Sequence, residues 1–140
     1  MIDFTDREMI NAFRMHKRSS AQMPPSGTKR LVQFYAVECG LKALHMRNEG
    51  KRLTGECPYF SIVQHDIRAL LGNLNFPPKL YSKIASTILS PINKKGKLIK
   101  REVAPRDYNQ MWRYGAVSNE DEILEKELDA IIVKIEQDLR

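Results

Sequence analysis

The chain has 140 residues, with 23 Lys and Arg against 17 Asp and Glu, and its formal net charge is +6. This length can bury a core of its own, no apolar run reaches the roughly 20 residues of a membrane span, and the acidic start differs from a secretory signal. Cys39 and Cys57 make neither a CxxC motif nor a disulfide framework, so we expect a reducing, cytoplasmic environment. From the length we expect one domain over residues 1–140.

Two helices are predicted in the first third of the chain. Thr5 and Glu8 have the spacing of a capping box, and apolar residues behind them recur with helical periodicity. This pattern predicts a short helix that runs to about Arg18. After a proline-containing linker, Ser26 can cap a long second helix that ends near Asn48.

The second helix is apolar on almost every side, yet it carries Glu38 and Lys42 one turn apart. A helix of this kind is normally buried, and a buried charge is tolerated when it is paired and hydrogen-bonded. We therefore predict an ion pair between positions i and i+4. The alternative is a polar pocket, or a device that aligns a partner helix.

Two further helices are predicted in the middle of the chain. A loop with turn-forming residues covers 51–61, and apolar residues with helical spacing follow it until Gly72. A double proline then begins a fourth helix over about 77–89, which Pro91 ends.

The last third contains a basic segment and a closing amphipathic helix. The segment 91–106 is predicted to be a basic loop, in which residues 98–103 can form a short strand or remain irregular. A turn of helix over 108–114 leads to the last helix, which Ser118 caps. The fold class that follows is all-α, as an up-and-down four-helix bundle with a short extra N-terminal helix.

Several enzyme classes are excluded because their motifs are missing. The chain has no GxxxxGK[ST], GxGxxG or HExxH motif, and its histidines and cysteines lack metal-ligand spacing. ATPase, dinucleotide-binding and zinc-enzyme functions are therefore excluded. We expect no metal and no cofactor.

Three segments with polar residues follow one another along the chain. They are Ala36-Val-Glu-Cys-Gly-Leu-Lys-Ala-Leu44, His65-Asp-Ile-Arg-Ala-Leu-Leu71 and Arg113-Tyr-Gly115. In this order they resemble the HEPN family over about residues 28–139. The resemblance implies a helical bundle that usually dimerises. Members are ribonucleases of toxin and antiviral systems, or non-catalytic modules that bind nucleotides or partner proteins.

The resemblance also implies how these residues act. Glu38, Lys42 and Tyr114 would form a buried polar network facing Arg113, His65 and Asp66. The ribonucleases of the family carry Arg followed, after four to six residues, by His, and no Arg here has a His at that spacing. We therefore expect a non-catalytic or divergent module of a bacterial or phage defence or toxin system, which binds a partner protein and RNA or nucleotide. The alternative is an active metal-independent ribonuclease that uses Arg113, His65 and Asp66.

The same residues also have purely structural interpretations. His65 and Asp66 stand where the third helix is expected to begin, and a carboxylate there can act as a helix cap. Arg113 follows Trp112, on which a guanidinium can stack while it pairs with a carboxylate. Both interpretations remain open from the sequence.

The candidate nucleic-acid-binding residues are Lys94, Lys95, Lys97, Lys100 and Arg101. Residues 79–113 hold nine Lys and Arg against two acids, whereas residues 119–140 hold eight acids against three bases. Several cations on one loop gain affinity for phosphates by counterion release. The alternatives are a solvated charge run, or a loop that docks on the acidic last helix of a neighbouring subunit. As partners we expect a second copy or another protein, and no membrane.

Overall fold

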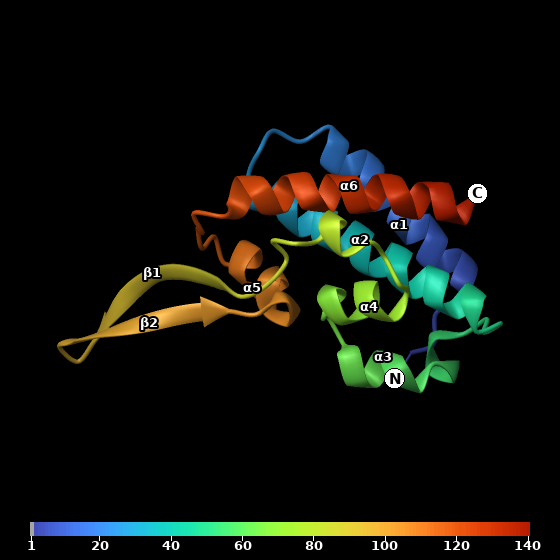
Figure 1. The fold of residues 1–140 in the computed structure, drawn as a ribbon, viewed down its shortest axis with the longest axis horizontal. Coiled ribbons are helices and arrows are strands. Elements are labelled where there is room, and N and C mark those ends of the chain that lie inside the picture. The colour runs from blue at the N-terminus through green and yellow to red at the C-terminus, as the bar shows by residue number, and fades with distance from the viewer. Residues whose placement is uncertain (1) are drawn as a thin grey trace.

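Helix α2 (Gly27–Asn48) lies at the centre of the computed structural model, which describes residues 2–140 (Figure 1). It is contacted by α1 (Asp6–Ala21), α4 (Ile67–Asn73), α5 (Tyr108–Arg113) and α6 (Asp121–Leu139). Because these neighbours cover it on several sides, side chains all around α2 are buried. The prediction that this helix is buried is confirmed.

The predicted caps of the first two helices are also confirmed. Thr5 Oγ1 accepts a hydrogen bond from the Glu8 backbone N–H at 3.1 Å, and Glu8 Oε1 accepts one from the Thr5 N–H at 2.9 Å. Ser26 Oγ accepts from the Lys29 N–H at 3.1 Å. Each side chain satisfies an amide that the first helical turn leaves without a backbone partner.

Where one third helix was predicted after residue 61, the structure has two short helices, α3 (Pro58–Val63) and α4, and α3 already begins inside the predicted loop 51–61. Gln64 separates them with a φ of 51°, a left-handed conformation that interrupts a right-handed helix. Asp66 Oδ1 then accepts from the Ala69 N–H at 3.1 Å and caps α4. The apolar spacing continues across this interruption, and for that reason periodicity alone predicted one helix.

The fourth helix predicted over 77–89 is absent. Its first part forms a 3-10 turn (Pro78–Leu80), and its last part begins strand β1 (Thr87–Lys94). Ile84, between them, is fully buried, so the apolar residues of this segment mark single contacts with the core and not one helical face. The protein is therefore mostly helical but not all-α. The expected up-and-down four-helix bundle is not confirmed.

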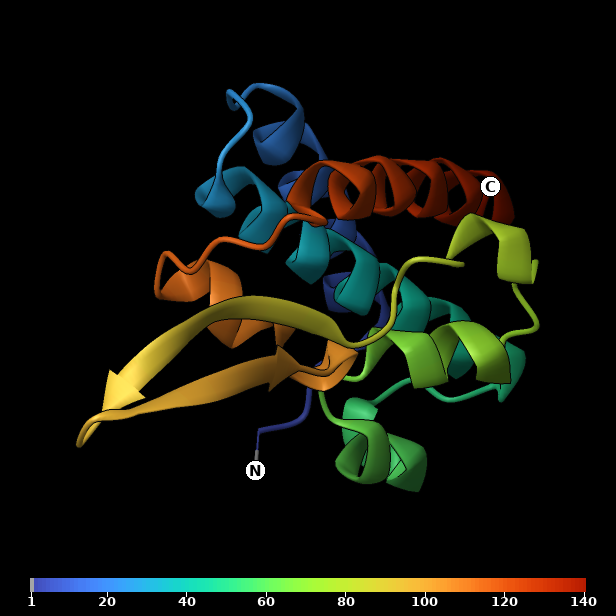
Figure 2. The ribbon, with the colours of Figure 1, turned by 60° about the vertical axis from the view of Figure 1, so that its left-hand side comes forward.

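Strands β1 and β2 (Lys97–Val103) form an antiparallel hairpin that projects from the helices (Figures 1 and 2). Lys95 and Gly96 connect them with φ values of 54° and 81°. Positive φ at both central residues is the requirement of a type I′ turn, which matches the twist of two paired strands. The basic segment is thus a hairpin, and the strand predicted as one alternative for residues 98–103 is confirmed.

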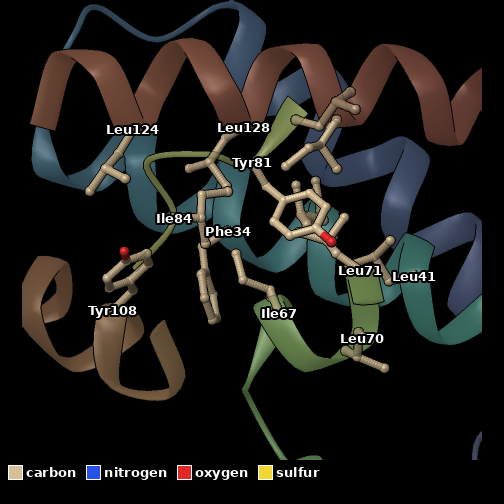
Figure 3. Close-up of a cluster of buried hydrophobic side chains, with 14 of the residues drawn as sticks. Phe34, Leu41, Ile67, Leu70, Leu71, Tyr81, Ile84, Tyr108, Leu124 and Leu128 are labelled. Carbon is tan, nitrogen blue, oxygen red and sulfur yellow. The ribbon is translucent and has the colours of Figure 1, made fainter. Parts of the chain in front are cut away.

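One hydrophobic core joins the helices, and Figure 3 shows its central part. The buried side chains drawn there include Phe34, Leu41, Ile67, Leu71, Ile84, Tyr108, Leu124 and Leu128. Gly40 lies where α1 and α6 approach α2: a Cβ added there would lie 2.7 Å from Ile135 Cγ2 and 2.8 Å from Phe13 Cδ1. Among residues 2–140, no helix combines the length and the apolar character needed to cross a bilayer.

Candidate functional site

The two charges on α2 belong to a cluster of three side chains. Lys42 Nζ donates to Glu38 Oε2 at 2.9 Å, which confirms the predicted pair. The same oxygen lies 2.9 Å from His65 Nδ1, so this carboxylate accepts from both side chains. Glu38 is only 7% exposed, whereas the side chain of His65 is half exposed. The imidazole is therefore the part of the cluster that solvent reaches most readily.

The other residues expected around this cluster have different surroundings. Asp66 caps α4, as its structural interpretation proposed. Arg113 is exposed, and its Nη2 donates to the hydroxyl of Tyr35 at 2.6 Å, which raises the pKa of Arg113 further. Tyr35 and Glu38 are three residues apart on α2, so Arg113 is held about one helical turn from the cluster.

Tyr114 is not part of a buried network, because it is 77% exposed. It lies at the end of α5, where the chain turns at Gly115 with a φ of 74°. The prediction of a buried Tyr114 beside Glu38 and Lys42 is therefore wrong. The side chain of Arg113 also hydrogen-bonds Tyr35, a residue that its sequence position on an apolar helix did not mark as a site residue.

The cysteines do not offer a nucleophile. Burial raises the pKa of the Cys39 thiol to about 11, and the nearby Glu38 carboxylate acts in the same direction. Burial also raises the pKa of Cys57. Near neutral pH both side chains are thiols, whereas the thiolate is the reactive form. In the part of the chain that the structure describes, no group of three or more His, Cys, Asp or Glu side chains could hold a metal ion.

The candidate nucleic-acid-binding residues all lie on the hairpin of residues 87–103, which we call the basic arm. Lys94 and Lys97 face each other across the turn, and Lys95 lies in the turn itself. These three and Lys100 are exposed, while Arg101 is partly covered and donates from Nε to the Ser90 carbonyl at 3.0 Å. Within residues 2–140, none of the five makes an ion pair.

The base of the basic arm is attached to the body, while its tip is free. Thr87 Oγ1 lies 2.6 Å from Ser118 Oγ and donates to Glu120 Oε1 at 2.9 Å. Leu89 is buried and forms an isolated bridge with Ser118. Toward the tip, Leu98 is 73% exposed. The arm is thus positioned at one end and presents both of its faces to solvent at the other (Figure 2).

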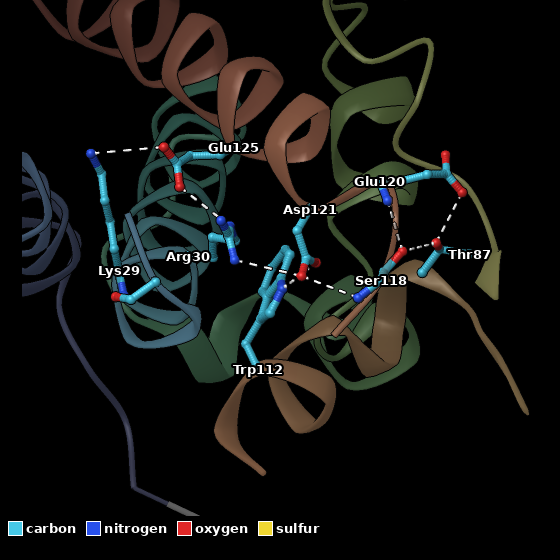
Figure 4. Close-up of polar contacts among 9 residues, drawn as sticks. Lys29, Arg30, Thr87, Trp112, Ser118, Glu120, Asp121 and Glu125 are labelled. Carbon is cyan, nitrogen blue, oxygen red and sulfur yellow. Dashed lines mark hydrogen bonds and ion pairs between the residues drawn. The ribbon is translucent and has the colours of Figure 1, made fainter. Parts of the chain in front are cut away.

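A polar network supports the loop to which the arm is attached (Figure 4). Asp121 accepts hydrogen bonds from Trp112 Nε1 and from the Ser118 backbone N–H, both at 3.1 Å. The Arg30 guanidinium lies 3.5 Å from the same carboxylate and 3.2 Å from Glu125. These contacts join α2, α5 and α6 next to Ser118. Nothing in the local sequence around Arg30 indicated this role.

Comparison with known proteins does not add a relative to these observations. No protein-family model matches the chain, and neither a curated protein nor a solved structure matches it. The resemblance to the HEPN family therefore stays a prediction from three short motifs. The features of the chain that bear on its function are the basic arm and the polar cluster on α2.

Proposed function

We propose that this protein is a nucleic-acid-binding module and that the basic arm is its contact surface. The observation that carries the proposal is a set of five cations, without ion-pair partners among residues 2–140, on a projecting hairpin. Cations in this state gain affinity for phosphates because binding releases the condensed counterions of a nucleic acid. Because the arm is attached to the rest of the protein at one end, all five cations can approach one ligand together.

The competing explanation, in which the arm docks on the acidic last helix of another copy, has less support. Six of the seven acids of α6 already have polar partners inside their own chain. Those with such partners are Asp121, Glu125, Glu127, Asp129, Glu136 and Asp138. An arm from a neighbouring subunit would have to replace these partners, whereas phosphates would meet cations that have no ion-pair partner to give up.

The form of the arm favours duplex DNA as the ligand. The major groove of B-form DNA is wide enough for a two-stranded ribbon, whereas that of A-form RNA is too narrow for side chains to read. Proteins that hold single strands usually stack bases on aromatic side chains, and residues 87–103 contain no aromatic residue. The exposed apolar side chains there are aliphatic, such as Ile92 and Leu98, and can contact thymine methyl groups.

The salt dependence of binding tests the proposal. Five phosphate contacts predict a slope of about −4.5 for the logarithm of affinity against the logarithm of salt concentration, which is roughly a 500-fold decrease in affinity between 50 and 200 mM salt. Changing Lys94, Lys95, Lys97 and Lys100 together to Gln should reduce the slope by about 0.9 for each phosphate that a lysine no longer neutralises. Binding would be measured by fluorescence anisotropy with duplex DNA, duplex RNA and single-stranded RNA of one sequence.

A matched control separates the arm from net charge. Lys51, Lys79, Lys83 and Lys126 are exposed lysines outside the arm, and changing all four to Gln removes the same charge. We expect this variant to keep the slope of the unaltered protein. If both variants show the same reduced slope, or if no nucleic acid binds at 50 mM salt, the proposed function is wrong.

A second candidate function is RNA cleavage, and one observation favours it. Glu38 accepts from His65 Nδ1, which leaves Nε2 of a half-exposed imidazole available for proton transfer. Arg113, about one helical turn away, could contact a phosphate. The test is incubation with labelled RNA in the presence of EDTA: fragments that His65→Gln abolishes would support cleavage. RNA that stays intact over many hours would exclude cleavage, and nucleic-acid binding would be the only function left of the two.

Association with a second chain is also part of the proposal, although one argument for it is not supported. Uncovered apolar faces on α2 and α6 would favour association, but the structure buries most of both within the monomer. The remaining support is two exposed apolar side chains that follow Arg113 in the chain, Tyr114 (77% exposed) and Val117 (72% exposed). Light scattering over a concentration series tests this, and a monomer mass throughout would exclude self-association.

A further inference from the structure

A cavity of about 570 Å³ lies between the start of the chain and α3, away from the basic arm. Cavities that bind small molecules in proteins have volumes of roughly 300 to 1,000 Å³. Its walls come from segments far apart in sequence: residues 2–9, α2, and the stretch from Thr54 to His65.

The apolar wall of this cavity is held in place. Ile2, Phe4, Met9, Pro58 and Phe60 line it. The backbone of Phe4 is fixed by two hydrogen bonds to Thr54: its N–H donates to the side-chain Oγ1 at 3.0 Å, and its carbonyl accepts from the backbone N–H at 2.9 Å. A terminal segment anchored in this way forms a defined wall of the cavity. An apolar ring system can therefore bury itself here without a large ordering cost.

The opposite end of the cavity is polar and has unused hydrogen-bond donors. Lys42 and His65 both line it, with Glu38 buried behind them. Lys42 gives one of its three N–H groups to Glu38, and its Nζ lies 5.5 Å from the centre of the Phe60 ring. His65 uses Nδ1 for Glu38, so its Nε2 remains. With the imidazole protonated, the three side chains carry a net charge of +1, which a single anionic group would neutralise.

We propose that this cavity binds a small amphipathic anion, in which an apolar ring system meets the Phe4 and Phe60 side and one acidic group meets Lys42 and His65. The pairing follows from the two ends of the cavity, because an apolar ligand without a charge would cover the remaining N–H groups of Lys42 and Nε2 of His65 without offering them a hydrogen-bond partner. Hydrogen bonds between ionised groups are short and strong, so the acidic group should set the orientation. This site is independent of the basic arm.

Two dyes with the same ring system test the proposal on the full chain at pH 6. One is the anion 1-anilinonaphthalene-8-sulfonate, and the other is its uncharged analogue N-phenyl-1-naphthylamine. We expect the anion to bind about tenfold more tightly, and His65→Gln to reduce this preference to within about threefold while the uncharged dye binds as before. Phe4→Ser should weaken both dyes, and amide NMR shifts should locate the bound anion at Phe60 and Gln64.

The outcomes that would overturn the proposal are distinct. They are equal affinity for both dyes in the unaltered protein, a preference that His65→Gln leaves unchanged, or NMR shifts confined to other surfaces. His65 is half exposed and Phe4 is 46% exposed, so both variants should fold, which circular dichroism checks. Lys79→Gln, an exposed charge change away from the cavity, should leave both affinities unaltered.

Discussion

Replacing Glu38 by Ala should destabilise the protein far more than removing an exposed carboxylate. Glu38 Oε2 lies 2.9 Å from both Lys42 Nζ and His65 Nδ1, and the side chain of Lys42 is only 14% exposed. Removing one partner of a buried pair costs roughly 3 to 5 kcal/mol because the other charge is left alone. Lys42 borders the cavity and can turn toward water, so we expect about 3 kcal/mol, at the lower end of that range. For a domain of this size the melting temperature should fall by about 10 °C.

A double-mutant cycle measures this interaction directly. Urea unfolding of Glu38→Ala, Lys42→Ala and the double variant would be followed by circular dichroism. We expect the destabilisation of the double variant to be smaller than the sum of the two single destabilisations. The difference, which is the interaction energy, should exceed about 1 kcal/mol. Glu49→Ala, at the exposed end of the same helix, is the control and should stay within about 0.5 kcal/mol of the unaltered protein. Additive effects, or a Glu38→Ala variant that melts within a degree or two of the unaltered protein, would refute the buried pair.

Three further predictions concern packing, the polar network and pH. Gly40→Val should cost about 2 to 3 kcal/mol, seen as a lower urea midpoint, because its side chain meets Ile135 and Phe13; a neutral result would mean that α1 and α6 can move apart. Asp121→Ala should cost about 2 to 4 kcal/mol and shift the emission of the chain's single tryptophan, Trp112, since it removes the hydrogen-bond acceptor of the indole; unchanged emission would contradict that hydrogen bond. Cys39 favours its thiol form in the folded state, so its contribution to stability is complete below about pH 9 and is lost as the pH rises toward 11. The urea midpoint of Cys39→Ala should therefore fall less between about pH 9 and 11 than that of the unaltered protein. Identical profiles of urea midpoint against pH would contradict a raised pKa of Cys39.

The features that the sequence determined by itself are those whose partners are close along the chain. The caps at Thr5 and Ser26 join a side chain to an amide three residues away, and the Glu38 to Lys42 contact joins positions one turn apart. Such contacts depend only on helix geometry, which local apolar spacing and capping residues already indicate. The burial of α2 could be predicted for the same reason, because an apolar pattern on all sides leaves no face for water.

The features that only the tertiary structure decided join residues far apart in the chain. His65 reaches Glu38 across 27 positions and Arg113 reaches Tyr35 across 78, so neither contact has a local signal. The segment from Thr87 to Leu89 becomes a strand because β2 offers it backbone partners, and this pairing overrides a helical spacing of apolar residues. Which side chains meet at the cavity was likewise decided by how the helices and the N-terminal segment pack. Contacts of this kind depend on the path of the whole chain, which no local pattern encodes.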